Sequence, residues 1–264
     1  MKSLLLAGLA FSALIMPAMA ADMPIKALPP PPTWTGFYWG VNAGWIGSSQ
    51  YNITNTATDT DGGGLGFLLG AGFIPGTIPV SHSGFIGGGQ IGYNWQIDPS
   101  YVWGIEADFQ GTTVNGGAGS VGLIGPNTIT TIYKYELDDL GTVRARFGWL
   151  SSPNLLWYGT GGLAYGQTKL SSSVQCPLGL PPCFNTSNTA ISSTHTSVGW
   201  TAGAGVEWKL TPVWSVKVEY LYVELGSQSN TLVYTYAPFT SSLTSTVQRE
   251  QDNIVRFGVN YKLF

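Results

Sequence analysis

The sequence predicts an all-β protein: an eight-stranded antiparallel transmembrane up-and-down β-barrel with short periplasmic turns and four long extracellular loops. Only 9% of the residues are charged, while 13% are aromatic and 36 are glycines. Ordinary soluble domains carry about 25% charged residues. No segment after the leader resembles a membrane-spanning helix. Short stretches of alternating apolar and polar residues recur instead, as in membrane strands whose alternate side chains face lipid.

Residues 1–20 have the features of a signal peptide that is removed during export. Lys2 precedes an apolar run over residues 4–16, and residues 18–20 form an A-x-A cleavage site. The apolar run is too short to cross a bilayer as a helix. The sequence therefore predicts an exported protein whose mature chain begins at residue 21.

A Pro-rich segment, residues 21–33, is predicted to lie in the periplasm. Its consecutive prolines at 29–32 favour an extended spacer. The outer-membrane barrel is predicted to occupy residues 34–264. The eight strands predicted within it are 36–49, 84–96, 101–111, 135–150, 155–169, 196–209, 213–226 and 250–264.

The connections between these strands alternate strictly between short and long. The short ones, which contain Pro with Asp, Ser, Asn or Thr, are 97–100, 151–154 and 210–212. The long ones, rich in Gly, Ser, Thr and Asn, are 50–83, 112–134, 170–195 and 227–249. Outer-membrane barrels have short periplasmic turns and long outer loops. The even strand number therefore predicts that both termini lie on the periplasmic side.

The stretch GTVRARFGW places Arg144 and Arg146 on one face of a strand, opposite apolar residues. Since the apolar face of each strand is expected to meet lipid, the two guanidinium groups are expected to point inward. A narrow eight-stranded barrel is filled by side chains, so its interior charges need partners. The predicted interior charge network has equal numbers of acids and bases: Glu106, Asp108, Arg144, Arg146, Glu207, Lys217, Glu219 and Arg256.

The sequence predicts neither an enzyme nor a cofactor. Glu106 and Asp108 resemble a general acid–base pair, but no nucleophile and base arrangement accompanies them. His82 and His195 lie at junctions of loops and strands and are weak candidates for haem or metal contact. Loss of Lys2 with the leader lowers Lys+Arg from 11 to 10 against 14 Asp+Glu, a net charge near −4. This charge gives no support for nucleic-acid binding.

Two further features concern the long loops. Cys176 and Cys183, the only cysteines, are expected to form a local disulfide, because the protein is exported. Closing so short a loop contributes about 2.5 kcal/mol in the chain-entropy model. The Gly-rich stretch 62–76 is too apolar for a freely solvated loop. Either it packs over the barrel mouth, on other loops or on a partner, or it extends the neighbouring strands.

An ordered set of motifs resembles the small outer-membrane β-barrel (porin-family) proteins of alphaproteobacteria, a group that includes immunogenic surface antigens. The motifs are WTGFYWGVNAGW, GGGQIGYNWQ, GIEADFQG, GTVRARFGW, LLWYGTGGLAYG, GWTAGAGVEW, SVKVEYLYVELG and NIVRFGVNYK. This resemblance implies an outer-membrane location and the barrel fold.

The leading functional hypothesis is a structural, surface-exposed barrel of the Gram-negative envelope, with an interior closed by the ionic network. The alternatives are a small-solute porin with weak diffusion activity, and a loop surface that binds haem or a host partner. The expected partners are outer-membrane lipid, lipopolysaccharide and the barrel assembly machinery, which would engage the C-terminal strand. Whether a host or peptidoglycan-associated partner exists stays open.

Overall fold

A computed structural model describes residues 33–263, except 49, 61–63, 178–187 and 237. The predicted signal peptide and nearly all of the Pro-rich segment therefore lie outside the described residues. Both assignments stay predictions. No helix in the described part of the chain is long and apolar enough to cross a membrane.

The predicted eight-stranded antiparallel barrel is confirmed. Its strands close into a ring in the order β1-β12-β9-β8-β7-β6-β5-β4. Their bounds are β1 Gly36–Ser48, β4 His82–Gln96, β5 Tyr101–Ile124, β6 Asn127–Ser152, β7 Leu155–Gln175, β8 Asn188–Lys209, β9 Trp214–Leu225 and β12 Glu250–Lys262. Each strand pairs with its neighbours in the chain, and β1 pairs with β12 to close the ring.

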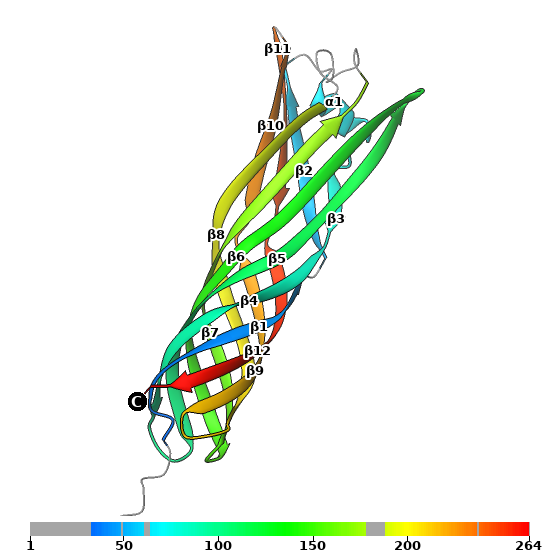
Figure 1. The fold of residues 1–264 in the computed structure, drawn as a ribbon. Coiled ribbons are helices and arrows are strands. Elements are labelled where there is room, and N and C mark those ends of the chain that lie inside the picture. Colours follow the sequence, from blue (N-terminus) through cyan, green and yellow to red (C-terminus); the bar gives the residue numbers. More distant parts are fainter. Residues whose placement is uncertain (1–32, 49, 61–63, 178–187, 237, 264) are drawn as a thin grey trace, which may run out of the picture. The chain divides into compact units, whose positions relative to one another are not determined.

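Strand β1 begins at the end of the barrel where β12 finishes, because Tyr38 pairs with Lys262 (Figure 1). The short connections β4–β5, β6–β7 and β8–β9 also lie at this end, which is the periplasmic end of such barrels. The long connections all leave the opposite end.

The outer wall of the barrel is apolar and carries aromatic side chains in two belts, as lipid and its two interfaces require. The belt on the side of the short turns is Trp95, Trp103, Trp149, Trp157, Trp208 and Trp214, each at least 43% exposed. The belt on the outer side is Trp45, Phe85, Phe109, Tyr165 and Trp200, each at least 39% exposed.

The long connections differ from the expectation of irregular loops. Strand β5 continues to Ile124 and β6 starts at Asn127, so most of the predicted loop 112–134 is an extension of the β5–β6 hairpin. Gly125 has a φ of 57° in its two-residue turn, where glycine is the favoured residue. Alternate small residues, rather than strongly apolar ones, form these extensions. The alternation of apolar and polar residues therefore predicted strands that are shorter than those in the structure.

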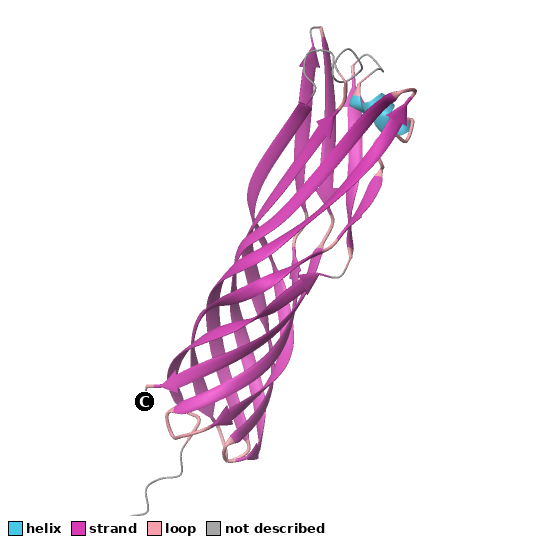
Figure 2. Cartoon of the chain, turned by 45° about the vertical axis from the view of Figure 1, so that its right-hand side comes forward, coloured by secondary structure: helices cyan, strands magenta, loops and turns pink. Residues whose placement is uncertain are grey.

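The first and last long connections form a second, four-stranded sheet in the order β10-β11-β2-β3. Its strands are β2 Tyr51–Asp59, β3 Thr77–Val80, β10 Gln228–Tyr236 and β11 Phe239–Val247. The short helix α1, Leu65–Gly70, lies beside β2 and β11. Figure 2 shows this helix in cyan at the end opposite the C-terminus.

The described part of the apolar stretch 62–76 packs against the other long connections instead of extending β1 and β4. Leu65, Leu68 and Ile74 are fully buried. Their cluster includes Val174 from β7 and Leu243 from β11. Burial of these apolar side chains fixes α1 on the outer sheet, which explains why so apolar a segment is tolerated outside the membrane.

Cys176 follows β7 directly and is buried within this same cluster. Cys183 lies outside the described residues. The pairing of the two cysteines therefore stays a prediction.

Candidate functional site: the barrel interior

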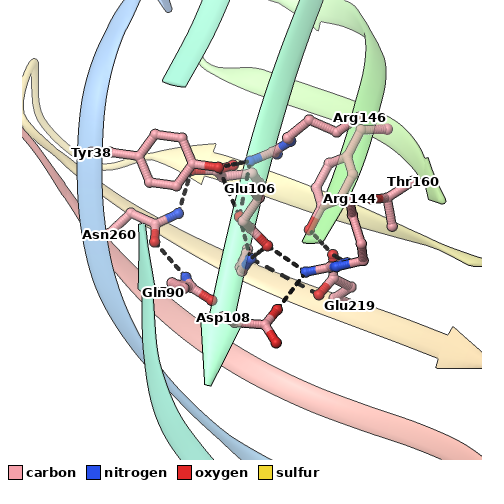
Figure 3. A network of polar contacts seen from close by, with 12 residues as sticks. Tyr38, Gln90, Glu106, Asp108, Arg144, Arg146, Thr160, Glu219 and Asn260 are labelled. Atoms are coloured by element: carbon pink, nitrogen blue, oxygen red, sulfur yellow. Dashed lines mark hydrogen bonds and ion pairs between the residues drawn. The ribbon is translucent and has the colours of Figure 1, made fainter. Parts of the chain in front are cut away.

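The structure places all eight charged residues of the predicted interior network inside the barrel and brings them together. Figure 3 shows Glu106, Asp108, Arg144, Arg146 and Glu219 pointing toward one another. Their side chains are at most 3% exposed. This follows from alternation, since each lies on the strand parity opposite the lipid-facing residues. Five strands, β5, β6, β8, β9 and β12, contribute the charges.

Arg144 on β6 is the centre of the network. Its Nη2 donates to Glu106 Oε1 at 2.5 Å and to Asp108 Oδ2 at 2.9 Å, both on β5. Its Nη1 donates to Glu219 Oε1 on β9 at 3.0 Å. One guanidinium group therefore joins three carboxylates from two strands on different sides of the barrel.

Arg256 and Lys217 complete the central cluster. Arg256 Nη2 lies 2.9 Å from Asp108 Oδ2 and 2.6 Å from Glu219 Oε2. Lys217 Nζ donates to both oxygens of Glu106, at 2.7 and 2.8 Å. Because these groups are removed from water, their mutual pairing is needed to offset the cost of burying each charge.

Arg146 forms a second centre nearer the short turns. Its Nη2 donates to Glu207 Oε2 at 2.7 Å, and its Nη1 donates to Tyr38 Oη at 2.9 Å. Its guanidinium carbon lies 4.0 Å from the ring centroid of Tyr158. Tyr38 in turn donates to Glu106 Oε2 at 2.8 Å, which links the two centres.

The uncharged members of this network were not predicted from the sequence. Tyr158 donates to Glu219, and Ser215 donates to Glu207. Asn260 also donates to Glu207, while Gln90 donates to Asn260. Each lies on the inward parity of its strand, so the signal was present. With Tyr38 and Gln90 included, all eight barrel strands contribute a side chain.

Each basic residue lies directly opposite a glycine on a neighbouring strand. The pairs are Arg144 with Gly162, Arg146 with Gly104, Lys217 with Gly258 and Arg256 with Gly44. A Cβ atom at any of these glycines would lie within 3.1 Å of an atom of the facing basic residue. Gly104 and Gly258 therefore leave space for the Arg146 and Lys217 side chains, while Gly162 and Gly44 allow close approach of the strand backbones that carry Arg144 and Arg256.

An apolar layer lies directly beyond the charges on the outer side. Along β12, Ile254 is the next inward residue after Arg256, and along β1, Ile46 follows Gly44. The layer is Ile46, Ile86, Leu140, Leu221, Val223 and Ile254, each at most 2% exposed. Packed aliphatic side chains leave little room for water, so this layer adds a dry barrier to the ionic one.

Beyond the apolar layer, the structure joins His82 to two acids that sequence analysis had not singled out. His82 Nε2 lies 2.8 Å from Asp252 Oδ1 and 3.4 Å from Glu250 Oε1. His195, the other histidine, lies on β8 with its side chain exposed. Glu250 and Asp252 occupy alternate positions of the same strand as Arg256, so their side chains point to the same face. This pattern in the sequence could have placed them inside the barrel.

The network crosslinks strands and leaves few charged groups available for other chemistry. The carboxylates of Glu106, Glu207 and Glu219 each accept hydrogen bonds on both oxygens. Within the described residues, Asp108 Oδ1, Arg146 Nε and Arg256 Nη1 have no hydrogen-bond partner. Buried water is the usual partner of such atoms.

A closed antiparallel ring with an apolar wall, two aromatic belts and a polar, filled interior defines a small outer-membrane β-barrel protein. The chain belongs to the family of the outer membrane protein beta-barrel domain, whose match spans residues 5–262. Membership of the family that the motifs indicated is thus confirmed.

Relatives support the same assignment. The chain is 36% identical over 276 residues to the 31 kDa outer-membrane immunogenic protein of Brucella melitensis, covering 99% of this chain and 100% of the relative. It is 30% identical over 213 residues to the 22 kDa outer membrane protein of Rhizobium leguminosarum bv. viciae, covering 79% and 71%. The protein is therefore an outer-membrane β-barrel protein with immunogenic relatives.

Solved structures show weaker likeness. The crystal structure of Ail, the attachment invasion locus protein of Yersinia pestis, is 14% identical, with a TM-score of 0.32. The match covers 87% of this chain and 99% of the Ail chain. A score this low supports no further inference.

Proposed function

We propose that the protein is a structural, surface-exposed component of the outer membrane, and that its interior is closed by the ionic network and the apolar layer above it. The observation that carries this proposal is the arrangement around Arg144. This residue contacts three carboxylates, and its side chain is 0% exposed. A guanidinium group in a conducting pore would instead face water.

The balance of charge supports the same proposal. Four acids meet four bases in the network around Arg144 and Arg146, whereas a selective pore more often carries an excess of one sign. The apolar layer also interrupts any hydrated route between the two ends. The protein is thus proposed to act without catalysis, through its stable wall and its outer surface.

Haem binding finds no support at His82, because that side chain is 0% exposed and lies inside the barrel. His195 is exposed, but it is an isolated histidine, a residue that is usually only part of the surface. The outer sheet and the strand extensions form the surface on which recognition by a host partner would take place.

Planar-bilayer recordings combined with urea unfolding in detergent test the proposal. The wild-type barrel is expected to show no stable conductance. Arg144→Ala is expected to lower the free energy of unfolding by about 3–5 kcal/mol, because it leaves buried carboxylates unpaired. The matched control is Lys169→Ala, whose ion pair with Glu136 lies at the surface with side chains 40% and 42% exposed. Its expected cost is about 0–1 kcal/mol.

The porin alternative predicts the opposite result. In a hydrated channel, Arg144 is solvated, so Arg144→Ala leaves stability nearly unchanged and shifts the conductance toward cations. Wild-type conductance steps together with that shift would replace the structural proposal with the porin.

A further inference from the structure

A second polar cluster lies inside the barrel beyond the apolar layer, and the closed-interior proposal does not use it. It consists of His82 at the start of β4, and Glu250 and Asp252 at the start of β12, and is named the His82 cluster below. The three side chains are at most 2% exposed. Asp252 pairs with Ser48 on β1, three residues past Trp45 of the outer aromatic belt. The cluster therefore lies outside the membrane-spanning part of the barrel.

The geometry of the cluster fits a metal ion. One candidate ligand atom from each residue lies within 4.8 Å of the other two. His82 Nε2 lies 2.8 Å from Asp252 Oδ1 and 3.4 Å from Glu250 Oε1. Ligands at about 2.0–2.2 Å from a tetrahedral ion are about 3.4 Å apart. Small side-chain rotations would therefore bring the three atoms to coordination distance.

The His82 cluster lacks the balance of acids and bases found in the interior charge network around Arg144. Among the ion pairs in the described residues, His82 is the only basic partner of Glu250 and Asp252. Glu250 Oε1 and Asp252 Oδ2 are buried and have no hydrogen-bond partner in the described part of the chain. When both buried carboxylates are ionised, one imidazole leaves negative charge uncompensated, and a divalent cation would neutralise it.

Neighbouring side chains hold the three residues as a second layer around a metal would. Tyr135 donates a hydrogen bond to Glu250 Oε2 and leaves Oε1 free. The Tyr135 ring also stacks on the His82 ring, with centroids 4.9 Å apart. Tyr51 Oη lies 3.4 Å from His82 Nδ1, the nitrogen that faces away from the acids. These contacts orient Nε2 toward the two carboxylates.

A pocket on the outer surface lies beside the cluster. A surface pocket is lined by Tyr51, Arg249 and Gln251, together with residues of β2, β11 and the last long connection. Tyr51 lies between this pocket and His82, while Gln251 separates the two acids along β12. Movement of the Tyr51 side chain would therefore open the cluster to this pocket without disturbing the apolar layer.

We propose that the His82 cluster binds one divalent transition-metal ion of the Zn²⁺ class, through His82 Nε2, Glu250 and Asp252. Three protein ligands leave one coordination position for water. The ion joins β4 to β12 across β1, and so fixes the rim from which the outer sheet rises. This role is independent of whether the barrel conducts.

The competing arrangement is a proton shared between the two carboxylates. Burial, and then the charge of Asp252, raise the pKa of Glu250 well above its ordinary range. A protonated Glu250 would reduce the negative charge without a metal. Titration with metal ions distinguishes the two arrangements.

The first experiment uses the full wild-type chain in detergent, stripped of metal with EDTA and titrated with Co²⁺ and then Zn²⁺. We expect about one Co²⁺ per chain, visible absorption bands of a low-coordinate site, and loss of these bands when Zn²⁺ displaces Co²⁺. X-ray absorption of the Zn²⁺ form is expected to show one imidazole and otherwise oxygen ligands. Both measurements need no variant, so a variant that fails to fold does not affect them.

The second experiment compares variants. His82→Gln and Asp252→Asn are each expected to weaken Zn²⁺ binding more than about 100-fold, and Tyr135→Phe about 10-fold. The matched controls are His195→Gln and Glu136→Gln, which remove an exposed imidazole and an exposed carboxylate and should leave binding unchanged.

Two results would overturn the proposal. One is the absence of saturable Co²⁺ or Zn²⁺ binding by the wild type below about 1 mM, which would favour the shared proton. The other is wild-type affinity in folded His82→Gln, which would place the ion elsewhere.

Discussion

Arg144 on β6 lies directly opposite Gly162 on β7, and a Cβ atom at Gly162 would lie 2.7 Å from the Arg144 Cα and 2.1 Å from the Val143 carbonyl oxygen. The atoms in the way belong to the backbone, so no side-chain rotation relieves the contact. The close approach of β6 and β7 beside the central arginine thus depends on the absence of one methyl group at Gly162.

Gly162→Ala is therefore expected to destabilise the barrel by about 1–3 kcal/mol, the usual cost of overpacking. The matched control is Gly161→Ala, one residue away on the lipid face, where the nearest atom to a Cβ would be at 3.6 Å. Urea unfolding in detergent measures both. Equal stability of the two variants would show that the facing glycine is not needed for space.

The pair Arg146 and Glu207 is expected to show strong energetic coupling. Either Arg146→Met or Glu207→Gln leaves one buried group without its 2.7 Å partner, at a cost of about 3–5 kcal/mol. The double variant removes both groups and should cost less than the sum of the single changes. A double-mutant cycle of unfolding free energies measures the coupling. Additive costs would mean that the two groups are solvated separately.

The outer helix α1 is expected to loosen in acid. Asp59 accepts hydrogen bonds from the Ser241 hydroxyl and from the backbone N–H of Gly64, Gly66 and Phe67. Partial burial alone raises the pKa of Asp59, but these hydrogen bonds outweigh it and hold the pKa below its ordinary value.

Since the folded-state pKa is the lower one, this stabilisation is present above the ordinary Asp pKa of about 3.9 and is lost as the pH falls through the folded value. Amide hydrogen exchange of α1 at pH 7 and pH 3, corrected for intrinsic rates, measures it. Asp59→Asn is the control, and its α1 protection should show a smaller pH dependence than the wild type.

Cys176 and Cys183 are expected to be joined in the native protein. Thiol labelling of the denatured, unreduced chain should then modify neither residue, and labelling after reduction should modify both. Complete labelling before reduction would contradict the pairing. The double variant Cys176→Ser/Cys183→Ser measures how much the disulfide contributes to stability. The free energy of unfolding of the outer region is expected to fall by about 2.5 kcal/mol.

Much of the barrel could be predicted because side chains along each strand of its wall alternate between the lipid and the interior. Alternation alone puts Glu106 and Arg144 on the inward parity, and the strict change between short and long connections fixes the number of strands and the side of the termini. The same rule does not specify which carboxylate each base contacts. Arg256 contacts Asp108 across the interior of the ring. The two residues are so far apart in sequence that no local pattern predicts this contact.

The outer region was harder to predict because it depends on pairing between remote segments. Strand β2 pairs with β11, so that Ala57 lies opposite Leu243, and nothing in either segment identifies the other. The His82 cluster has the same origin. His82 lies on β4 and Asp252 on β12, and both of these strands flank β1 in the closed ring. An isolated histidine in a sequence gives no sign of such neighbours.

The position of Arg256 has a consequence for the assembly of the barrel. This arginine lies on β12, the last described strand of the chain, yet its partners Asp108 and Glu219 lie on β5 and β9. Until β12 joins β1, those carboxylates lack one of their cations and keep their hydration, so an unfinished barrel holds a wet, negatively charged core. Loss of water from the core is therefore expected to accompany the pairing of β12 with β1, which closes the ring.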